Sequence, residues 1–355
     1  MSAEQIDKPT VDTYYSNLPK REHESIFAVT LKILQKDETL RGLYRWNEFS
    51  FDVEHTGNVP WSSYIKEGKE VTDNDITELM TFLAVQYDFS PPRGRLEDAI
   101  KTLAVRKPYH PIKDYLESLQ WDGQERLETW LSDICGVQLT EYSKAVSKKV
   151  LTAAVARVYH PGIKYDYMAI LEGRQGIRKS TLLETLAGIG YHSSISFSMS
   201  NKEIVDIMRG KWILEVKEMH GFYRAEIERV KALLDQHTDR VRLSYGHRAQ
   251  DFKRNNIIIG TMNPLGENRY FSDETGNRRF WPIHCEGKIN LDKIILMRDQ
   301  LWAQALLTFK QGEPLYMHTD LLETLAENEQ NQRLSGDPWE DIIKEYLNQK
   351  IGLPN

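Results

Sequence analysis

Residues 166–188 read DYMAILEGRQGIRKSTLLETLAG, and the fold class follows from them. An apolar run over 166–172 predicts a buried strand, and the apolar spacing after Lys179 predicts a helix. The residues between them match the pattern G-x-x-x-x-G-K-[ST] at Gly173, Lys179 and Ser180. In this pattern the loop turns its backbone N–H groups inward and cradles phosphate oxygens. We therefore expect a nucleotide site here, in preference to a strand–helix turn that binds no ligand.

The loop departs from the pattern at Arg178, which stands where the pattern has its second glycine. That glycine lets the backbone approach a phosphate closely, whereas Arg178 carries a Cβ and a long side chain. Two outcomes are open: the loop is distorted, or the side chain points outward and the loop survives with Gly176 at the turn. Lys179 would bridge the β- and γ-phosphates, and Ser180 would hold Mg²⁺. The residues expected to bind ATP are Gly173, Gln175, Gly176, Ile177, Arg178, Lys179, Ser180 and Thr181.

A second apolar run, 211–216, contains Glu215, and Glu218 follows it. Phosphoryl transfer needs a carboxylate at a strand tip beside the phosphate loop, to hold Mg²⁺ or to orient the attacking water. A glutamate inside an apolar run is uncommon without a partner. We therefore favour a functional Glu215 over the alternative of two surface glutamates. Either glutamate fits the role, and we take Glu215, with Ser180, as the expected Mg²⁺ ligands.

A third apolar run, 257–262, leads into Asn263 and a proline. A polar amide at this strand tip would position the hydrolytic water against the γ-phosphate, although Asn-Pro is also a frequent turn pair. Further along, Arg278 and Arg279 lead into another apolar run, 279–283, of which Arg279 is the first residue. One of the two arginines would project to a neighbouring subunit's γ-phosphate and stabilise the charge of the transition state. The alternative is ordinary surface charge.

Strands and helices alternate in this part of the chain, which indicates an α/β fold with a P-loop NTPase core and a mainly parallel sheet. A mainly helical N-terminal domain and C-terminal helices complete the expected architecture. We expect a strand pair within 41–64 and helices over 73–87, 94–106, 111–120, 124–134, 139–159, 291–311, 318–331 and 336–349. The expected domains are a flexible tail 1–20, an N-terminal domain 21–135, the ATPase core 136–290 and a helical segment 291–355.

The charge balance limits how the chain could contact nucleic acid. Its 355 residues include 46 basic and 52 acidic side chains, so bulk positive charge is excluded and a local patch is needed. Residues 238–256, TDRVRLSYGHRAQDFKRNN, hold five basic and two acidic residues. Within them Val241, Leu243 and Tyr245 alternate with polar residues before Gly246, which predicts a hairpin. Its cations would grip a phosphate backbone and its aromatic would stack on a base, unless the hairpin is merely solvated. The residues expected to bind DNA are Arg242, Tyr245, His247, Arg248 and Lys253.

The cysteine count and the N-terminal sequence argue against a disulfide-rich, zinc-binding, secreted or membrane protein. Two cysteines, Cys135 and Cys285, are too few for a disulfide framework or a four-ligand zinc site. The N-terminus has no basic-then-apolar signal, and no stretch approaches the roughly 18 apolar residues of a membrane helix. We expect a soluble intracellular protein with reduced thiols and no membrane partner.

Taken in order, these motifs resemble the virulence-associated protein E family of phages and mobile genetic islands, over roughly residues 105–285. The most specific parts are YHPIKDYLESLQWDGQERLETWL, the phosphate loop, RGKWILEVKEM, and GTMNP followed by DETGNRRFWPI. That family resembles the AAA+-like superfamily 3 helicases and is often joined or neighboured by a primase. It usually has glycine where Arg178 stands, which puts ATP turnover in doubt, and residues 1–110 show no evident primase motif.

The resemblance implies an ATP-driven DNA helicase or translocase that serves replication of a phage or mobile element in the bacterial cytoplasm. It also implies a homo-oligomeric ring such as a hexamer, a track of single-stranded or forked DNA, and a primase or another replication protein as partner. The hairpin around Tyr245 falls where superfamily 3 helicases place their pore hairpin. The implied site residues are Lys179 and Ser180 for nucleotide and Mg²⁺, Glu215 and Glu218 on the acidic strand, Asn263 as polar sensor, and Arg278 or Arg279 as the finger in trans.

Two other functions compete with the helicase. In the first, Arg178 has ended turnover and the protein is an adaptor that binds DNA or a partner. In the second, the same loop serves a small-molecule kinase, which the basic hairpin and the lack of an evident arginine-rich lid disfavour.

Overall fold

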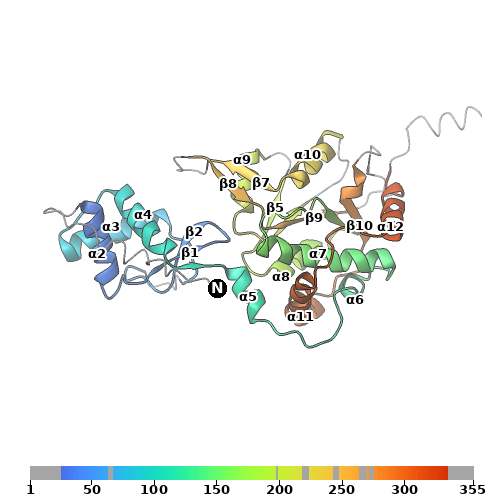
Figure 1. The fold of residues 1–355 in the computed structure, drawn as a ribbon, viewed down its shortest axis with the longest axis horizontal. Coiled ribbons are helices and arrows are strands. Elements are labelled where there is room, and N and C mark those ends of the chain that lie inside the picture. The colour runs from blue at the N-terminus through green and yellow to red at the C-terminus, as the bar shows by residue number, and fades with distance from the viewer. Residues whose placement is uncertain are drawn as a thin grey trace, which may run out of the picture. The chain divides into compact units, whose positions relative to one another are not determined.

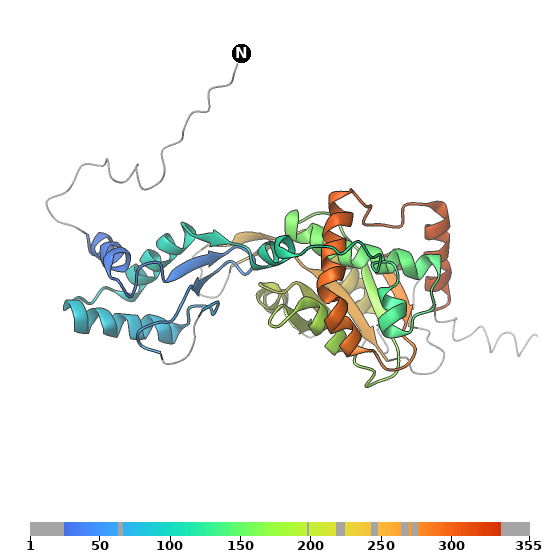
Figure 2. The ribbon, with the colours of Figure 1, turned by 90° about the horizontal axis from the view of Figure 1, so that it is seen from below.

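The computed structural model describes residues 25–62, 67–196, 199–217, 224–242, 248–263, 270–271 and 276–334. The chain divides into two compact units, Met1–Tyr109 and His110–Asn355 (Figures 1 and 2). The expected tail 1–20 and the expected helix 336–349 lie outside the described residues. Within those residues, no helix is long and apolar enough to cross a membrane.

In its described residues, 25–62 and 67–109, the first unit packs three helices with a small sheet. Its elements are α2 (Ile26–Lys36), β1 (Tyr44–Asn47), β2 (Asp52–His55), α3 (Asp73–Tyr87), α4 (Arg93–Val105) and β3 (Pro108–Tyr109). Strand β1 lies between β2, which runs antiparallel to it, and β3, which runs parallel. Helix α3 begins after Thr72, which forms a capping box with Asp75. The predicted strand pair and this predicted helix are both confirmed.

The second unit is an α/β domain built on a parallel sheet. Its elements are α5 (Pro111–Ser118), α6 (Trp130–Cys135), α7 (Glu141–Tyr159), β4 (Met168–Glu172), α8 (Lys179–Ala187), β5 (His192–Ile195), α9 (Asn201–Met208), β6 (Ile213–Val216), α10 (Arg224–Asp235), β7 (Thr238–Val241), β8 (Gln250–Lys253), β9 (Ile257–Met262), the 3-10 helix η1 (Asn277–Arg279), β10 (Phe280–His284), α11 (Leu291–Lys310) and α12 (Asp320–Asn331). Five strands pair in the order β10-β4-β9-β6-β5, all parallel. This confirms the predicted α/β class, with a P-loop-like core and helical parts.

Helices cover both faces of this sheet. Figure 1 shows α9 and α10 on one face and α7, α8 and α11 on the other. Because side chains alternate along a strand, Ile170, Leu214 and Ile258 pack on the first face, in one core with Ile204 of α9 and Val230 of α10. The central strands are therefore buried on both faces, which is why they read as continuous apolar runs.

Stacked indoles fix the helices on the second face. Trp212, directly before β6, stacks on Trp302 of α11 with ring centroids 4.0 Å apart. The Trp212 indole N–H donates to Ala154 O of α7, and that of Trp302 donates to Leu186 O of α8. Buried indoles usually find such acceptors, and here each bond joins two elements.

The clearest differences from the sequence predictions lie at α6 and β5. The helix predicted over 124–134 begins only at Trp130, because the backbone N–H groups of Arg126 and Leu127 donate to the Gln304 side chain at 2.9 Å instead of entering a helix. Strand β5 is not predicted from the sequence, since three of its four residues are polar or histidine and only Ile195 is buried. The domain limits expected at residues 135 and 290 stay a prediction.

Candidate functional site

Strand β4 delivers the chain into the phosphate loop, and α8 begins directly after it. The loop is tied at both ends: Gly173 N donates to Met262 O at 3.2 Å, and Ile289 N donates to Ile177 O at 3.0 Å. A Cβ on residue 173 would lie 2.6 Å from Ile177 Cδ1 and 3.0 Å from Cys285 O. Only glycine therefore fits at Gly173, for reasons of space.

Arg178 keeps the backbone path of the glycine that it replaces. Its φ of 78° and ψ of 32° are left-handed, a conformation that glycine adopts freely and that other residues adopt at a cost of roughly 1–2 kcal/mol. The side chain is exposed and, within the part of the chain that the structure describes, makes no hydrogen bond or ion pair. Of the two outcomes considered for this loop, the structure matches the one in which the arginine points outward and the loop survives.

The Lys179 ammonium group lies in the mouth of the loop. Its Nζ donates to Gly173 O at 2.7 Å, to Arg174 O at 3.0 Å and to Asn263 Oδ1 at 2.8 Å. Burial holds the pKa of Lys179 below its usual value, although the nearby Glu215 works in the opposite direction. A buried cation surrounded only by neutral oxygens is a strong site for an anion, and the N-terminus of α8 adds to this field.

Glu215 of β6 is wholly buried and has a partner on each carboxylate oxygen. Its Oε1 accepts from Ser180 Oγ at 2.7 Å and from Thr261 Oγ1 at 2.6 Å. Its Oε2 lies 3.4 Å from His192 Nε2 and 3.7 Å from Lys217 Nζ. Burial raises the pKa of this carboxyl group, but the hydrogen-bonding neighbours and the lysine charge outweigh it, so the pKa lies below the usual value. Glu215 is therefore ionised at neutral pH.

The oxygen atoms around Glu215 suit a magnesium ion. Ser180 Oγ and Thr261 Oγ1 both meet Glu215 Oε1, which gathers three hard oxygen donors at one point. Mg²⁺ is usually held by one or two carboxylates together with substrate phosphates, not by a cage of protein side chains. Among the described residues no three His, Cys, Asp or Glu side chains group into a metal site of their own. The donor set thus fits Mg²⁺ that binds together with a nucleotide.

Asn263 follows β9, the strand between β4 and β6. The carboxyl ends of parallel strands meet at one edge of a sheet, which is where α/β proteins bind ligands. The sheet order therefore brings Lys179, Glu215 and Asn263 together, as the sequence predicts, and the Lys179–Asn263 hydrogen bond joins two of them directly. Glu218 lies outside the described residues.

The two arginines before β10 differ in their surroundings. Arg279 is held by Asp235 through two hydrogen bonds of 2.8 Å. Arg278 is exposed and has no hydrogen bond or ion pair with any residue that the structure describes. Because Phe280 pairs with Met168 in the parallel sheet, both arginines lie near the start of β4, at the end away from its own phosphate loop. Only Arg278 is free to reach a neighbouring molecule.

The basic segment forms the predicted hairpin, in which β7 pairs antiparallel with β8. Arg254 is buried and bonds Asp239 at 2.7 and 2.8 Å, while Arg240 lies 3.7 Å from Asp251. These two pairs use both acidic residues of the window. Three other cations of the window, Arg242, Arg248 and Lys253, are exposed. Tyr245 and His247 lie outside the described residues.

Residues 116–335 match the model of the virulence-associated protein E-like domain, which is more than half of the chain. The chain belongs to this family. No curated protein matches it.

Three solved structures of the C-terminal region of NrS-1 resemble this VapE-like chain. The apo structure of region 305–718 is 13% identical, covers 91% of this chain and 76% of that chain, and has a TM-score of 0.43. An A-form apo structure of the same C-terminal region is 12% identical, covers 85% of this chain and 71% of that chain, and has a TM-score of 0.44. A further A-form apo structure, of region 305–718, is 13% identical, covers 92% of this chain and 79% of that chain, and has a TM-score of 0.44.

Sequence reasoning missed a buried ion pair at the start of the loop. Glu172, the last residue of β4, is wholly buried and directly precedes Gly173. Arg333 donates to both of its carboxylate oxygens, at 3.0 and 2.8 Å, and Tyr270 Oη donates to Oε1 at 2.7 Å. The signal was present, because Glu172 stands at the end of an apolar run as Glu215 stands within one.

A cavity of about 310 Å³ beside the loop was also missed. Its lining comes from the α6–α7 connection and the first turn of α7, from the end of β10 and the residues after it, and from the end of α12 and the residues after it, and includes His284, Glu286 and Arg333. The residue between the first two, Cys285, is the one whose carbonyl lies against Gly173. A volume of this size falls at the lower end of small-molecule sites, roughly 300–1,000 Å³. Three separated segments build this cavity, so no single motif reveals it.

Proposed function

We propose that this VapE-like protein is an ATP-hydrolysing motor, a helicase or translocase of the superfamily 3 type, that acts on single-stranded or forked DNA. Its setting would be replication of a phage or mobile element in the cytoplasm of the host cell. One observation carries the proposal: Lys179, Glu215 and Asn263 converge at one edge of the sheet, beside a loop with an exposed arginine and a hydrogen-bonded serine.

ATP would bind with its phosphates in the loop. The backbone N–H groups of residues 173–181 would donate to phosphate oxygens, and the Lys179 ammonium group would exchange its carbonyl and amide acceptors for them. Because burial disfavours the charged lysine, pairing with a phosphate would restore its pKa toward the usual value. The cavity beside the loop offers space for the base of the nucleotide.

The carboxylate of Glu215 would hold Mg²⁺ together with the Ser180 hydroxyl and phosphate oxygens. Bound there, Mg²⁺ would neutralise charge that develops on the transferring phosphoryl group. Thr261 and His192 would keep the Glu215 carboxylate in place and ionised while it accepts a hydrogen bond from the attacking water. The Asn263 amide, at the next strand tip, would fix the direction of that water against the γ-phosphate.

The remaining parts of the proposed motor come from other surfaces. Arg278 would act on the nucleotide of a neighbouring copy, which requires a homo-oligomeric ring such as a hexamer. The hairpin would present Arg242, Arg248 and Lys253 to a DNA backbone, with salt-dependent affinity. A primase or another replication protein is the proposed partner.

The test is a DNA-stimulated ATPase assay of the wild type against Lys179→Ala. We expect Lys179→Ala to lose ATP hydrolysis by roughly 10²-fold or more, since it removes the charge aimed at the phosphates. If the wild type hydrolyses ATP no faster than Lys179→Ala, the proposed motor function is wrong. A folded state is verified for both proteins by their thermal unfolding curves.

One observation favours a second function, the adaptor. Arg178 is exposed and positioned for contact with another molecule, and its family counterpart is usually glycine. If Arg178→Gly hydrolyses ATP while the wild type does not, Arg178 has ended turnover and the adaptor is right. If the wild type already hydrolyses ATP, the adaptor is excluded.

A further inference from the structure

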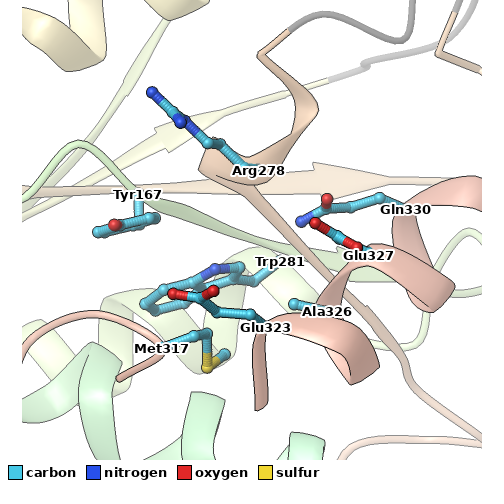
Figure 3. Close-up of a pocket in the computed structure, with 8 residues that line it drawn as sticks. All are labelled: Tyr167, Arg278, Trp281, Met317, Glu323, Ala326, Glu327 and Gln330. Atoms are coloured by element: carbon cyan, nitrogen blue, oxygen red, sulfur yellow. The ribbon is translucent and has the colours of Figure 1, made fainter. Parts of the chain in front are cut away.

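A second cavity, of about 180 Å³, opens at the end of the sheet away from the phosphate loop (Figure 3). Two stacked rings form one part of its lining, Tyr167 before β4 and Trp281 in β10, with centroids 4.6 Å apart and planes inclined by 17°. Glu323 and Glu327, one turn apart on α12, line it as well, and so does Arg278. A single water needs only roughly 10–15 Å³, so the cavity is large enough for a side-chain head group.

Three charged side chains and one indole of this cavity have no hydrogen-bond or ion-pair partner among the described residues, whereas Gln330 donates to Phe280 O at 2.9 Å. Glu323 and Glu327 are exposed and make no hydrogen bond or ion pair there. Figure 3 shows that the Arg278 guanidinium group points away from both of them. The indole N–H of Trp281 is buried without an acceptor in the same set of residues, although the Trp281 side chain is fully covered. Buried donors are normally satisfied, so this one marks an acceptor that the described residues do not provide.

These groups specify the chemistry of an occupant. The two carboxylates require a cation with several donors, and an aromatic face such as that of Tyr167 favours the flat guanidinium group of arginine. The Trp281 N–H requires a hydrogen-bond acceptor. A guanidinium group cannot accept a hydrogen bond, whereas a peptide carbonyl oxygen can. A peptide segment that carries an arginine meets both needs. With two carboxylates and one arginine, the cavity has a net charge of −1, which disfavours the phosphates of a nucleic acid.

The phosphate loop of a second copy has the complementary features. It exposes Arg178 without a partner in the described chain, and peptide carbonyls flank that residue. If Arg278 reaches the γ-phosphate of the next copy, the loop of that copy must face the cavity that Arg278 lines. We propose that Arg178 of one copy inserts between Tyr167, Glu323 and Glu327 of its neighbour; this contact rests on the ring of the proposed function.

Backbone strain selects Arg178 over Arg174, the other exposed arginine of the loop. Arg178 is held in the left-handed conformation, whereas Arg174 is not. A non-glycine residue persists in such a conformation where the surrounding structure compensates for it, which occurs most often at functional sites. An ion pair with the neighbouring copy supplies that compensation. Arg178, which departs from the glycine pattern, thereby connects the phosphate loop of one copy to the next subunit.

Site-specific crosslinking tests the contact without relying on activity. Arg178→Cys and Glu323→Cys are made in separate chains, mixed, and treated with a short bismaleimide. We expect a crosslinked dimer in the mixture and in neither variant alone, because the native Cys135 and Cys285 are buried. Thr324→Cys, an exposed neighbour on α12, is the matched control and should not crosslink with Arg178→Cys. Equal crosslinking of the two α12 variants, or of neither, overturns the contact.

Charge exchange gives a second measurement. Glu323→Arg should weaken self-association roughly tenfold or more in sedimentation, because it places like charges together, and Arg178→Glu in the same chain should restore it. If Glu323→Arg changes DNA affinity and leaves self-association alone, the cavity binds nucleic acid and the contact is wrong. The ATPase comparison with Lys179→Ala separates the contact from the motor function. If the wild type hydrolyses ATP faster than Lys179→Ala but the cysteine variants do not crosslink, the motor function stands and the contact is wrong. If the Arg178→Cys and Glu323→Cys chains crosslink but the wild type does not hydrolyse ATP, the contact stands and the proposed motor function is wrong.

Discussion

Two buried glutamates lie on strands that flank β9, and they are stabilised in opposite ways. Glu172 of β4 is held by the guanidinium group of Arg333 through two hydrogen bonds. Glu215 of β6 is held mainly by hydroxyl groups and a histidine, with a more distant lysine at 3.7 Å. A carboxylate locked into an arginine pair cannot exchange its partner cheaply, whereas hydroxyl donors can rotate toward a metal or water. The first arrangement supports the loop, and the second leaves a carboxylate ready for chemistry.

Breaking the arginine pair should give the largest effect. Arg333→Met removes the cation and leaves Glu172 buried and uncompensated, so the free energy of unfolding should fall by roughly 3–5 kcal/mol. Urea unfolding of the variant against wild type measures this. Arg93→Met is the matched control, because Arg93 pairs with Asp73 and Glu97 at the surface, where an ion pair contributes roughly 0–1 kcal/mol. Equal losses in the two variants would contradict the role assigned to the buried pair.

Neutralising the other glutamate should affect chemistry more than stability. Glu215→Gln keeps the size of the side chain but removes the charge that would hold Mg²⁺ and orient water, so we expect ATP hydrolysis to fall roughly 10²-fold or more. Nucleotide binding should survive, since Lys179 and the loop are unchanged. Steady-state hydrolysis and binding of a fluorescent ATP analogue separate the two. Full hydrolysis by Glu215→Gln would move the role to another carboxylate, with Glu218 as the first to test.

Lowering the pH should reduce the contribution of Glu215 to the stability of the folded protein. The pKa of Glu215 is lowered in the folded protein, so its charge stabilises the fold above the ordinary glutamate pKa of about 4.3. That contribution is lost as the pH falls through the lower folded value. The difference in unfolding free energy between wild type and Glu215→Gln should therefore shrink between pH 6 and pH 3. A difference that stays constant over this range would mean that the folded pKa is not lowered.

Much of the site was predictable because its residues belong to short local patterns. The loop, the glutamate within an apolar run and the amide at a strand tip each follow from neighbours in the sequence. The sheet order then brought Lys179, Glu215 and Asn263 to one edge, as parallel strands require. The elements missed depend on distant partners: Glu172 on Arg333, and the cavity beside the loop on three separated segments. Strand β5, which carries His192, was missed because its polar residues gave no strand pattern.

The smallest effect should come from restoring the glycine at position 178. Arg178→Gly relieves left-handed strain of roughly 1–2 kcal/mol, but glycine also gains freedom in the unfolded chain, so the net change should stay within about 1 kcal/mol and favour the variant. Arg174→Gly, in the same loop but without positive φ, relieves nothing and should destabilise the protein slightly. Thermal unfolding of the two variants measures the contrast. A variant that unfolds later than wild type yet self-associates more weakly would show that Arg178 stabilises the contact between copies at the expense of its own chain.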